Sequence, residues 1–253
     1  MLSIYLGGFR RAFLKAPFGP EAPGSKEGEK AYLRNAGPET VALNIRKPFT
    51  HRRCSTYLAD MGQMFSLLPQ TPGKLLDLGC GAGSTSWFFA KQGYEVLGVD
   101  IAPDMIEAAS KTHQLPNLRF ACMDYEALSM EHDFGCAVFC DSLHHAEDEA
   151  NALRAAYEAL APGGMLLIVE PGSGHGVSEE AIEAKRKYGV TEKEMPPWKT
   201  VPLLRRVGFR KIDIVYRVSL FAEAVSQKNA LKKLLKLLLF LMKRHSGIVV
   251  AYK

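Results

Sequence analysis

The chain has 253 residues, of which 47% are hydrophobic and 23% charged, so it can form one large globular domain with an accessory piece. A net charge of +5 is too small to predict a nucleic-acid-binding protein. No stretch reaches the roughly 20 apolar residues that cross a bilayer. The N-terminus also lacks the basic start and long apolar core of a secretory signal, so we expect a cytoplasmic protein.

The cysteines are odd in number and lie mostly in apolar runs, which is typical of small buried side chains in a reducing compartment. They are Cys54, Cys80, Cys122, Cys136 and Cys140. Cys136 and Cys140 lie four residues apart in a predicted strand, where ligand geometry for one metal would be awkward. We therefore expect neither a disulfide framework nor a cysteine metal site.

Residues 1–70 are predicted to form an N-terminal cap. Residues 16–30 are rich in Pro, Gly and charge, which predicts an exposed loop. Residues 50–68 carry apolar side chains close to helical spacing, and prolines at 69 and 72 end this predicted helix.

From residue 74 onward, short apolar runs alternate with amphipathic segments. The predicted strands are 74–78, 95–100, 118–123, 136–140, 165–170, 212–218 and 248–252. The predicted helices are 84–92, 103–112, 147–160, 198–207 and 227–244. This alternation is typical of an α/β fold with a parallel sheet covered by helices on both faces. The polar, Gly- and Pro-rich residues 172–200 are predicted to form a lid after the fifth strand.

A glycine-rich turn, Asp77-Leu-Gly79-Cys-Gly81-Ala-Gly83, joins the first predicted strand to the next helix. Glycines let the backbone turn tightly and approach a ligand closely. The dinucleotide fingerprint G-x-G-x-x-G needs a sixth glycine, but Ser84 stands at that position. Asp77 would also repel a pyrophosphate, whereas a carboxylate suits the cationic groups of S-adenosylmethionine.

Two further acidic residues follow the second and third predicted strands. Asp100 can accept hydrogen bonds from both hydroxyls of a ribose, or it can cap the helix that begins at Pro103, a role Asp104 could also fill. Asp124 can accept a hydrogen bond from the exocyclic amine of an adenine, and Tyr125 lies beside it.

Together these segments resemble the class I S-adenosylmethionine-dependent methyltransferases over about residues 73–171. The resemblance rests on LLDLGCGAG, VLGVDIAPDMIEAA, the loop at Asp124 and ALAPGGMLLIVEP. It implies a Rossmann-like sheet of seven strands, six parallel and one antiparallel, in a domain spanning 71–253. It also implies S-adenosylmethionine as the cofactor and S-adenosylhomocysteine as its product.

In that family the glycine loop holds the methionine part of the cofactor, the second-strand acid binds ribose and the third-strand acid binds adenine. These roles fall on Gly79 and Gly81, on Asp100 and on Asp124. The full set of candidate cofactor-binding residues is Asp77, Gly79, Gly81, Gly83, Asp100, Ile101, Asp124, Tyr125 and Asp141.

A narrower resemblance concerns the acceptor. Asn44-Ile45, Tyr57-Leu-Ala-Asp60 and residues 187–193 are similar to bacterial methyltransferases found alongside glycan and polysaccharide biosynthesis. This favours a small-molecule acceptor such as a sugar or a lipid-linked glycan.

The fourth predicted strand ends at Asp141-Ser-Leu-His144-His145, where an α/β sheet opens its ligand crevice. A hydroxyl acceptor benefits from a base near neutrality, so His144 or His145 is the candidate catalytic base for O-methylation. Glu170, after the fifth strand, can orient the base or the substrate, or make a structural hydrogen bond. His175 in the predicted lid is a third candidate.

A metal site is not expected. A zinc site built from His144, His145, Glu147 and Asp148 would need two adjacent histidines to face one ion, which is geometrically difficult.

The segment 227–244 is predicted to form a basic, leucine-rich helix. Its stripe of Leu231, Leu234, Leu235, Leu238 and Leu241 favours a helix that covers the sheet. Further apolar residues widen the arc, so peripheral membrane contact or a homodimer interface stays open. For residues 2–14, which include two arginines, membrane contact or a homodimer interface likewise stays open.

Two other function classes remain open. One is a non-catalytic S-adenosylmethionine-binding or scaffold protein with the same fold, and the other is a nicotinamide-dependent oxidoreductase. The sequence names neither the acceptor nor the atom that is methylated.

Overall fold

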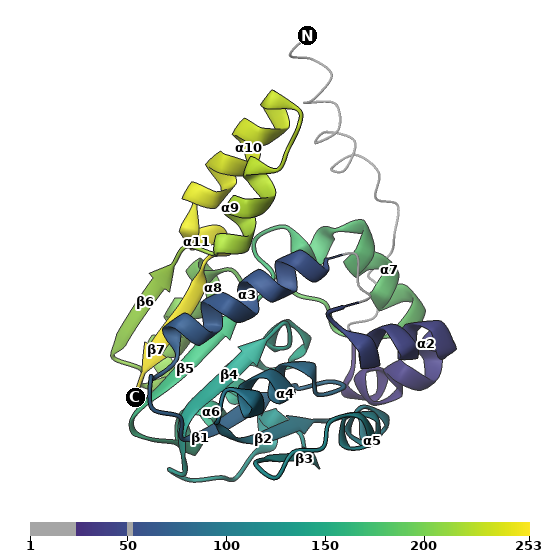
Figure 1. The fold of residues 1–253 in the computed structure, drawn as a ribbon, viewed down its shortest axis with the longest axis vertical. Helices are drawn as coiled ribbons and strands as arrows, with labels where there is room; N and C mark the ends of the chain where they lie inside the picture. The colour runs from purple at the N-terminus through teal and green to yellow at the C-terminus, as the bar shows by residue number, and fades with distance from the viewer. Residues whose placement is uncertain (1–23, 50–52) are drawn as a thin grey trace.

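The computed structural model describes residues 24–49 and 53–253. Its strands are β1 Lys74–Leu78, β2 Glu95–Asp100, β3 Leu118–Cys122, β4 Phe134–Cys140, β5 Leu160–Val169, β6 Lys211–Val215 and β7 Ile248–Tyr252. They form one sheet in the order β3-β2-β1-β4-β5-β7-β6 (Figure 1). β7 runs antiparallel to both of its neighbours, and the other six strands are parallel. The predicted seven-stranded Rossmann-like fold is therefore confirmed.

Helices cover both faces of the sheet. They are α2 Lys26–Arg46, α3 Cys54–Leu67, α4 Ser84–Lys91, α5 Pro103–Thr112, α6 Glu149–Ala159, α7 Glu179–Tyr188, α8 Pro197–Val207, α9 Val218–Val225, α10 Ala230–Leu241 and α11 Lys243–Ser246. Consecutive β1 residues point to opposite faces, so Leu75 packs in the core with α3 and α4, and Leu76 packs in the core with α6 and α8. Both leucines are fully buried. Burial on both faces explains the continuous apolar runs of the central strands.

The described part of the N-terminal cap begins with α2, which is broken at Gly37 (φ 80°, ψ 163°). Residues 26–30 are helical, so the prediction of a loop over 16–30 is wrong for its last part, and residues 16–23 lie outside the described residues. Ser25 caps this helix by accepting the Gly28 N–H, and two glutamates occupy the first turn. These are standard helix-start signals that the Pro- and Gly-rich composition obscured. The next helix, α3, lies where it was predicted.

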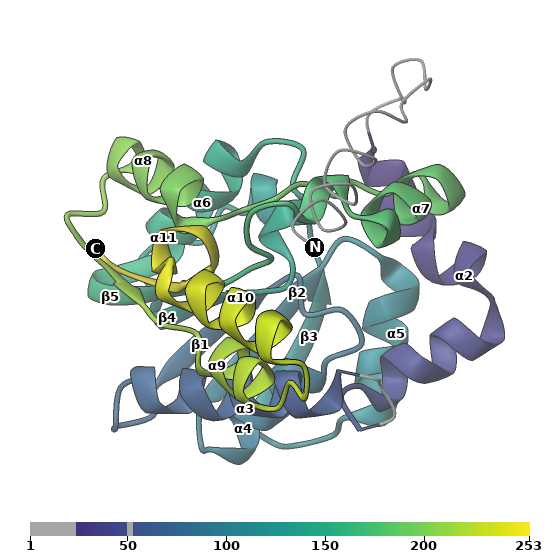
Figure 2. The same ribbon diagram turned by 90° about the horizontal axis from the view of Figure 1, so that it is seen from above.

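The predicted lid contains a short 3₁₀ turn, His175–Val177, and the helix α7, which lies beside α2 (Figure 2). The Ser25 N–H donates to the Gly189 carbonyl at 3.0 Å. The Thr191 N–H donates to Glu29 Oε1 at 2.7 Å. The cap and the lid are thus joined to each other above the sheet.

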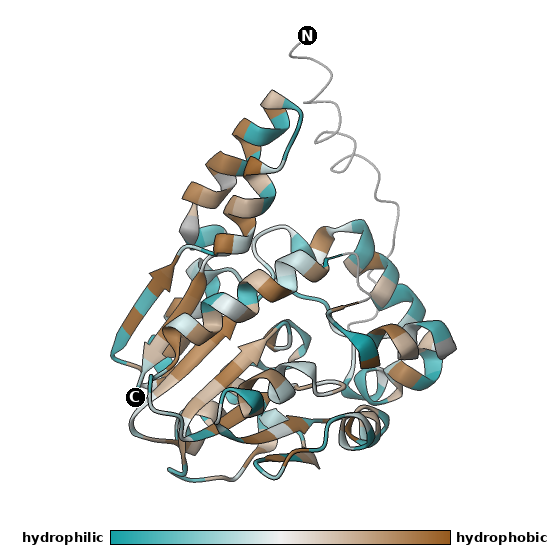
Figure 3. Cartoon of the chain, in the orientation of Figure 1, coloured by the Kyte–Doolittle hydropathy of each residue, from teal (hydrophilic) through white to brown (hydrophobic). Residues whose placement is uncertain are grey.

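The C-terminal leucine-rich helix α10 packs on α9, and the pair projects away from the sheet (Figure 1). The prediction that its leucine stripe covers the sheet is wrong, because Leu231, Leu234, Leu235, Leu238 and Leu241 are all 41–59% exposed. Figure 3 shows hydrophobic residues along both helices. Within 24–49 and 53–253, no helix combines the length and apolarity needed to span a membrane. Residues 2–14 lie outside the described residues.

Within the described residues the cysteines form no disulfide, and Cys80 and Cys136 are buried. The expectation of burial fails for Cys122, which is exposed.

A buried ion pair fixes α3 against the sheet. Arg217, just after β6, donates from Nε and Nη2 to the two carboxylate oxygens of Asp60 at 2.9 and 2.5 Å, and from Nη1 to the Glu170 carbonyl. Ser219 adds a third hydrogen bond to Asp60, which is only 3% exposed. The carboxylate is fully paired, which offsets the cost of burying its charge.

Replacing Arg217 with leucine is expected to lower the free energy of unfolding by about 3 kcal/mol or more, because Asp60 would stay buried without its cation. Urea denaturation followed by circular dichroism measures this loss. The double variant Arg217→Leu/Asp60→Leu removes both charges and is expected to recover part of it. A single variant as stable as the wild-type protein would contradict this account.

Candidate functional site

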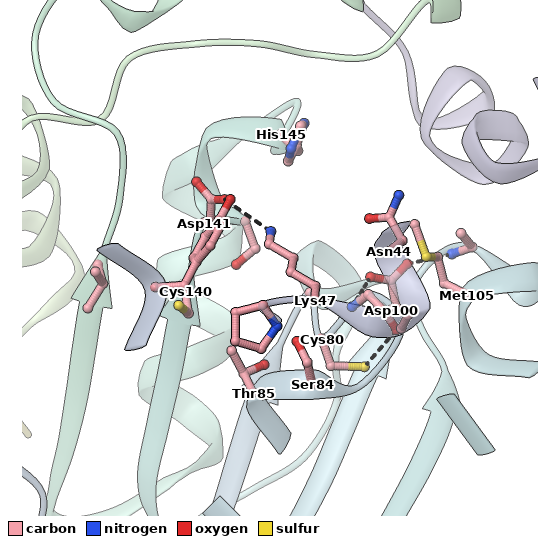
Figure 4. Close-up of a pocket in the computed structure, with 18 of the residues that line it drawn as sticks. Asn44, Lys47, Cys80, Ser84, Thr85, Asp100, Met105, Cys140, Asp141 and His145 are labelled. Carbon is pink, nitrogen blue, oxygen red and sulfur yellow. Dashed lines mark hydrogen bonds and ion pairs between the residues drawn. The ribbon is translucent and has the colours of Figure 1, made fainter. Parts of the chain in front are cut away.

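A cavity of about 300 Å³ lies at the carboxyl ends of β1, β2 and β4 (Figure 4). The chain turns in opposite directions from β1, to β2 on one side and to β4 on the other, so this edge is the topological switch point of the sheet. The cap and the lid close the cavity from above, with Tyr32 and Lys47 from the cap and Glu192 from the lid among the lining residues.

The glycine turn forms the floor of the cavity. Gly79, Gly81 and Gly83 all have positive φ angles, of 77°, 54° and 85°. A Cβ atom at Gly79 would approach Ser142 Cβ to 2.5 Å, and one at Gly83 would approach the Phe120 ring to 2.6 Å. Gly81 has no neighbour within 4 Å of that position and faces open space. Gly79 and Gly81 line the cavity as predicted, whereas Gly83 is absent from its lining and serves close packing.

Asp77 lies beneath the turn and does not line the cavity. It is 1% exposed, and its Oδ2 accepts hydrogen bonds from the hydroxyls of Thr85 and Ser86, both at 2.6 Å. Burial raises its pKa to about 6 despite these hydrogen bonds. The geometry does not support the predicted contact between Asp77 and the cofactor's amino group, because this carboxylate already anchors the first turn of α4.

Asp100 connects the glycine turn to the segment that leads into α5, and its role toward a ribose stays a prediction. Its Oδ2 accepts the Gly81 N–H and its Oδ1 accepts the Ala102 N–H, each at 2.9 Å, so it ties the glycine turn to the start of α5. Its side chain also lines the cavity, as does Ile101. Burial raises the pKa of Asp100 above its usual value.

Asp124 is not among the cavity-lining residues. Its Oδ2 accepts from Lys26 Nζ at 2.7 Å, and its Oδ1 caps a short turn by accepting the Glu126 N–H. The described geometry therefore does not support a direct adenine contact. Tyr125 does line the cavity, and its hydroxyl donates to the Ser142 carbonyl at 3.0 Å.

Asp141 at the end of β4 forms a charged group with two cap residues that the sequence analysis did not single out as site residues. Lys47 Nζ lies 3.5 Å from Asp141 Oδ2 and 4.4 Å from the centre of the Tyr57 ring, and the Tyr57 hydroxyl donates to the same oxygen at 3.3 Å. Burial alone would raise the pKa of Asp141, but Lys47 and the neighbouring His144 hold it well below its usual value. Asp141 itself has a left-handed backbone (φ 57°), which is unusual for a residue with a Cβ.

The two adjacent histidines differ in their access to the cavity. His144 is 3% exposed, is absent from the cavity lining, and its Nδ1 lies 2.7 Å from Glu170 Oε2. His145 does line the cavity, and its Nδ1 lies 2.6 Å from the Thr191 carbonyl. The position of His144 behind the cavity wall does not support its predicted role as the base, and Glu170 orients it from the interior.

The charge state of His145 depends on the cap and the lid. Burial alone would lower its pKa, but Glu29, Glu192 and the Thr191 carbonyl outweigh burial and raise the pKa to about 10. His145 is therefore protonated at neutral pH in this arrangement, so it is not a ready proton acceptor there.

The third histidine candidate joins the same region. His175 Nε2 lies 2.8 Å from Glu192 Oε2, and His144 Nε2 lies 3.6 Å from that oxygen. Glu147 and Asp148 are engaged elsewhere: Glu147 accepts the Lys26 N–H and Asp148 caps α6. Glu192 and Glu29 were missed as site residues, and only the resemblance over 187–193 pointed to Glu192.

Comparisons with known proteins agree with this geometry. Residues 75–164 match the family model described as a methyltransferase domain. A ubiquinone biosynthesis O-methyltransferase from Psychrobacter cryohalolentis is 34% identical over 101 residues, or 38% of this chain and 39% of the relative. Residues 75–164 are thus similar to the methyltransferase domain of S-adenosylmethionine-dependent methyltransferases.

Two further proteins are similar to parts of this chain. A solved S-adenosylmethionine-dependent methyltransferase from Mesorhizobium loti has a TM-score of 0.58 at 20% identity, and the match covers 77% of this chain and 98% of that one. An S-adenosyl-L-methionine-dependent Diels-Alderase from Talaromyces variabilis is 36% identical over 106 residues, covering 38% of this chain and 36% of the relative. The matches to the two curated relatives span less than half the length of either protein.

The different positions of the two acids predict different effects on cofactor binding. Asp100→Asn is expected to weaken the binding of S-adenosylhomocysteine by about tenfold or more, because a charged acceptor in the cavity is lost. Asp77→Asn is expected to change that affinity by no more than about threefold, since its side chain does not reach the cavity. Isothermal titration calorimetry measures both. Equal losses in the two variants would show that Asp77 acts on the cofactor after all.

The raised pKa of Asp77 also predicts a pH effect on stability. The folded-state pKa of about 6 exceeds the ordinary 3.8, so the stability that the proton provides is full below 3.8 and is lost as the pH rises through 6. Relative to Asp77→Asn, the wild-type protein is expected to lose about 2 kcal/mol between about pH 4.5 and about pH 7.5. Urea denaturation of both proteins at the two pH values measures the difference. A constant difference would contradict the assignment.

Proposed function

We propose that this protein transfers a methyl group from S-adenosylmethionine to an oxygen atom of a small, hydroxyl-rich acceptor, with a sugar or lipid-linked glycan precursor as the favoured class. The observation that carries this proposal is the single cavity that joins the glycine turn and Asp100 to a polar wall made by Lys47, Asp141 and His145. One end has the features of a nucleoside-binding site, and the other offers both hydrogen-bond donors and acceptors.

The residues present fit the cofactor. Gly81 leaves open space above the turn, and Asp100 places a carboxylate at the end of β2, where a ribose can be held. Gly79 and Gly81 would hold the methionine part, and Ile101 and Tyr125 would pack beside the nucleoside. When bound, S-adenosylmethionine supplies an electrophilic methyl group on a sulfonium. The transfer would leave S-adenosylhomocysteine and the methylated acceptor, and the proton lost from the acceptor oxygen would pass to solvent, because His145 is already protonated.

The chain's own contribution is alignment and enclosure. Holding two reactants in line can lower a barrier by about 7–11 kcal/mol in favourable cases. The cap and the lid restrict water at the reacting end, and Lys47, Tyr57 and His145 provide polar contacts for an acceptor. Among the two predicted bases, we place His145 beside the acceptor because it lines the cavity.

The exposed apolar face of α9 and α10 supports an acceptor attached to a lipid. Phe221, Leu234 and Leu238 are 43–54% exposed, and exposed lysines at 228 and 232 lie on the same projection. A basic amphipathic surface of this kind favours contact with an anionic membrane. A homodimer through the same face is the competing prediction, and sedimentation of the protein with and without vesicles distinguishes the two.

A second candidate function is binding of S-adenosylmethionine without methyl transfer. The relative described as a Diels-Alderase is the observation that favours it, because its name assigns a different reaction to an S-adenosyl-L-methionine-dependent protein. This alternative expects tight cofactor binding and no S-adenosylhomocysteine formed with any acceptor.

Activity with a panel of sugars, phenols and lipid-linked glycans tests the proposal, with S-adenosylhomocysteine release and transfer of a labelled methyl group as the readouts. With an active acceptor, Tyr57→Phe is expected to raise KM for the acceptor by about tenfold, the value of one or two hydrogen bonds, and to leave S-adenosylhomocysteine affinity nearly unchanged. A variant with wild-type KM would remove Tyr57 from the acceptor site.

A matched control is Tyr157→Phe. Tyr157 packs against Phe209, away from the cavity lining, so its variant is expected to keep both KM and cofactor affinity.

A further inference from the structure

Three histidines and three glutamates gather where the lid meets the ends of β4 and β5. We call His144, His145, His175, Glu29, Glu170 and Glu192 the histidine–glutamate cluster. Its members come from the cap, from the segments after β4 and β5, and from the lid. The ring centres of His144 and His145 lie 4.0 Å apart, and those of His144 and His175 lie 5.2 Å apart. A segment that only covers the cavity does not require three imidazoles in such close contact, whereas a ligand that they share would require it.

The hydrogen bonds orient two of the rings in the same way. His144 Nδ1 is held by Glu170, and His145 Nδ1 is held by the Thr191 carbonyl. In both rings the Nδ1 position is therefore occupied by an oxygen acceptor, and Nε2 remains for another partner. A histidine held at one nitrogen by a carboxylate or a carbonyl is the usual support for a histidine that binds a metal through the other nitrogen.

The remaining groups converge on Glu192. Potential ligand atoms of His144, His145 and Glu192 all lie within 4.8 Å of one another. His175 Nε2 lies 2.8 Å from Glu192 Oε2 and adds a fourth potential ligand. A tetrahedral ion with bonds of about 2.0–2.1 Å holds its ligand atoms about 3.3 Å apart, and His144 Nε2 and Glu192 Oε2 lie 3.6 Å apart. The objection that adjacent histidines cannot face one ion does not hold here, because the turn Leu143–His145 is a 3₁₀ turn that brings the two rings together.

We propose that the histidine–glutamate cluster is a binding site for a zinc-class divalent transition-metal ion, with His144, His145, His175 and Glu192 as ligands. Glu170 orients His144 and is not itself a ligand. Imidazole nitrogens with one carboxylate oxygen suit Zn²⁺ and its first-row neighbours, whereas Mg²⁺ and Ca²⁺ prefer oxygen ligands alone.

The position of the site gives the ion a role that rests on the proposed function. His145 and Glu192 line the cavity, so the ion can enter from it and can be reached by an acceptor. A hydroxyl group bound to such an ion loses its proton at lower pH than a free one, which favours attack on a methyl group. The ion would also tie the lid to the end of β4.

Metal binding is testable without substrate or cofactor. Protein freed of its affinity tag and dialysed against a chelator is titrated with Zn²⁺ by calorimetry, and with Co²⁺ by visible absorption. The wild-type protein is expected to bind one ion per chain. Glu192→Gln and His175→Ala are each expected to weaken binding by at least about tenfold. Because His144→Ala would remove the imidazole partner of the buried Glu170 Oε2, these two milder variants carry the test.

His113→Ala is the matched control. His113 packs near Trp87, outside the histidine–glutamate cluster, so its variant should bind Zn²⁺ as the wild-type protein does. The proposal is overturned if the wild-type protein shows no saturable binding of either ion. It is equally overturned if Glu192→Gln and His175→Ala, verified as folded by circular dichroism, bind like the wild-type protein.

Affinity for S-adenosylhomocysteine, measured on the same samples, separates this proposal from the proposed function. A protein that binds the ion but not S-adenosylhomocysteine would keep the metal site and refute the methyltransferase proposal. A protein that binds S-adenosylhomocysteine but not the ion would refute the metal site and leave the methyltransferase proposal standing.

Discussion

The buried carboxylate of Glu170 organises the end of the sheet on which the site depends. Its Oε1 accepts the N–H groups of Ser142 and Leu143, each at 2.8 Å, and its Oε2 meets His144 Nδ1. Ser142 in turn donates from its hydroxyl to the Leu78 carbonyl at 2.6 Å, just before the glycine turn. One side chain from the end of β5 therefore fixes the loop after β4 and, through that loop, the exit of β1. Hydrogen bonds to a charged, buried acceptor are strong, which suits a loop that must hold a defined shape.

The cap and the lid depend on this fixed loop. The Lys193 N–H donates to the His144 carbonyl at 3.1 Å, and the Met195 N–H donates to the Pro171 carbonyl. Glu29 in α2 then accepts the Thr191 N–H, so the cap is attached to the lid and the lid to the sheet. Asp60 and Arg217 hold the other cap helix, α3. Segments that lie far apart in the chain therefore complete the polar wall of the cavity made by Lys47, Asp141 and His145.

This dependence explains which features could be predicted from the sequence. The strands and the glycine turn are encoded locally, by apolar runs and by positions that need a positive φ angle. Both were placed to within a few residues, except that β5 begins at Leu160, five residues earlier than predicted, and β6 ends at Val215, three residues earlier. The direction of a side chain relative to the turn is not encoded in this way. Asp77 was interpreted as a ligand contact, but strand alternation places it under the turn, where two hydroxyls bind it.

The remaining errors have a related cause. The stripe on α10 gives the correct helix but not its partner, since a leucine-rich face suits a sheet, another helix or a membrane equally well. Lys47 and Glu29 carry no local signal, because their roles arise from contacts with residues about 90 to 160 positions away in the chain, such as Lys47 with Asp141 and Glu29 with Thr191.

The same division separates the donor and acceptor ends that we propose for the site. The matched family segment, 75–164, contains the glycine turn, Asp100, Asp141 and both adjacent histidines. Lys47, Tyr57, Glu29 and Glu192 all lie outside it. In the proposed function, the matched segment provides the donor end and one wall of the acceptor end, while the cap and the lid supply the rest. Relatives that match about 100 residues of this chain are named for O-methyl transfer and for a Diels-Alder reaction. A conserved scaffold that receives its acceptor chemistry from separate segments can change that chemistry without altering the cofactor-binding turn. The identity of the acceptor is therefore best sought in the cap, the lid and the histidine–glutamate cluster between them.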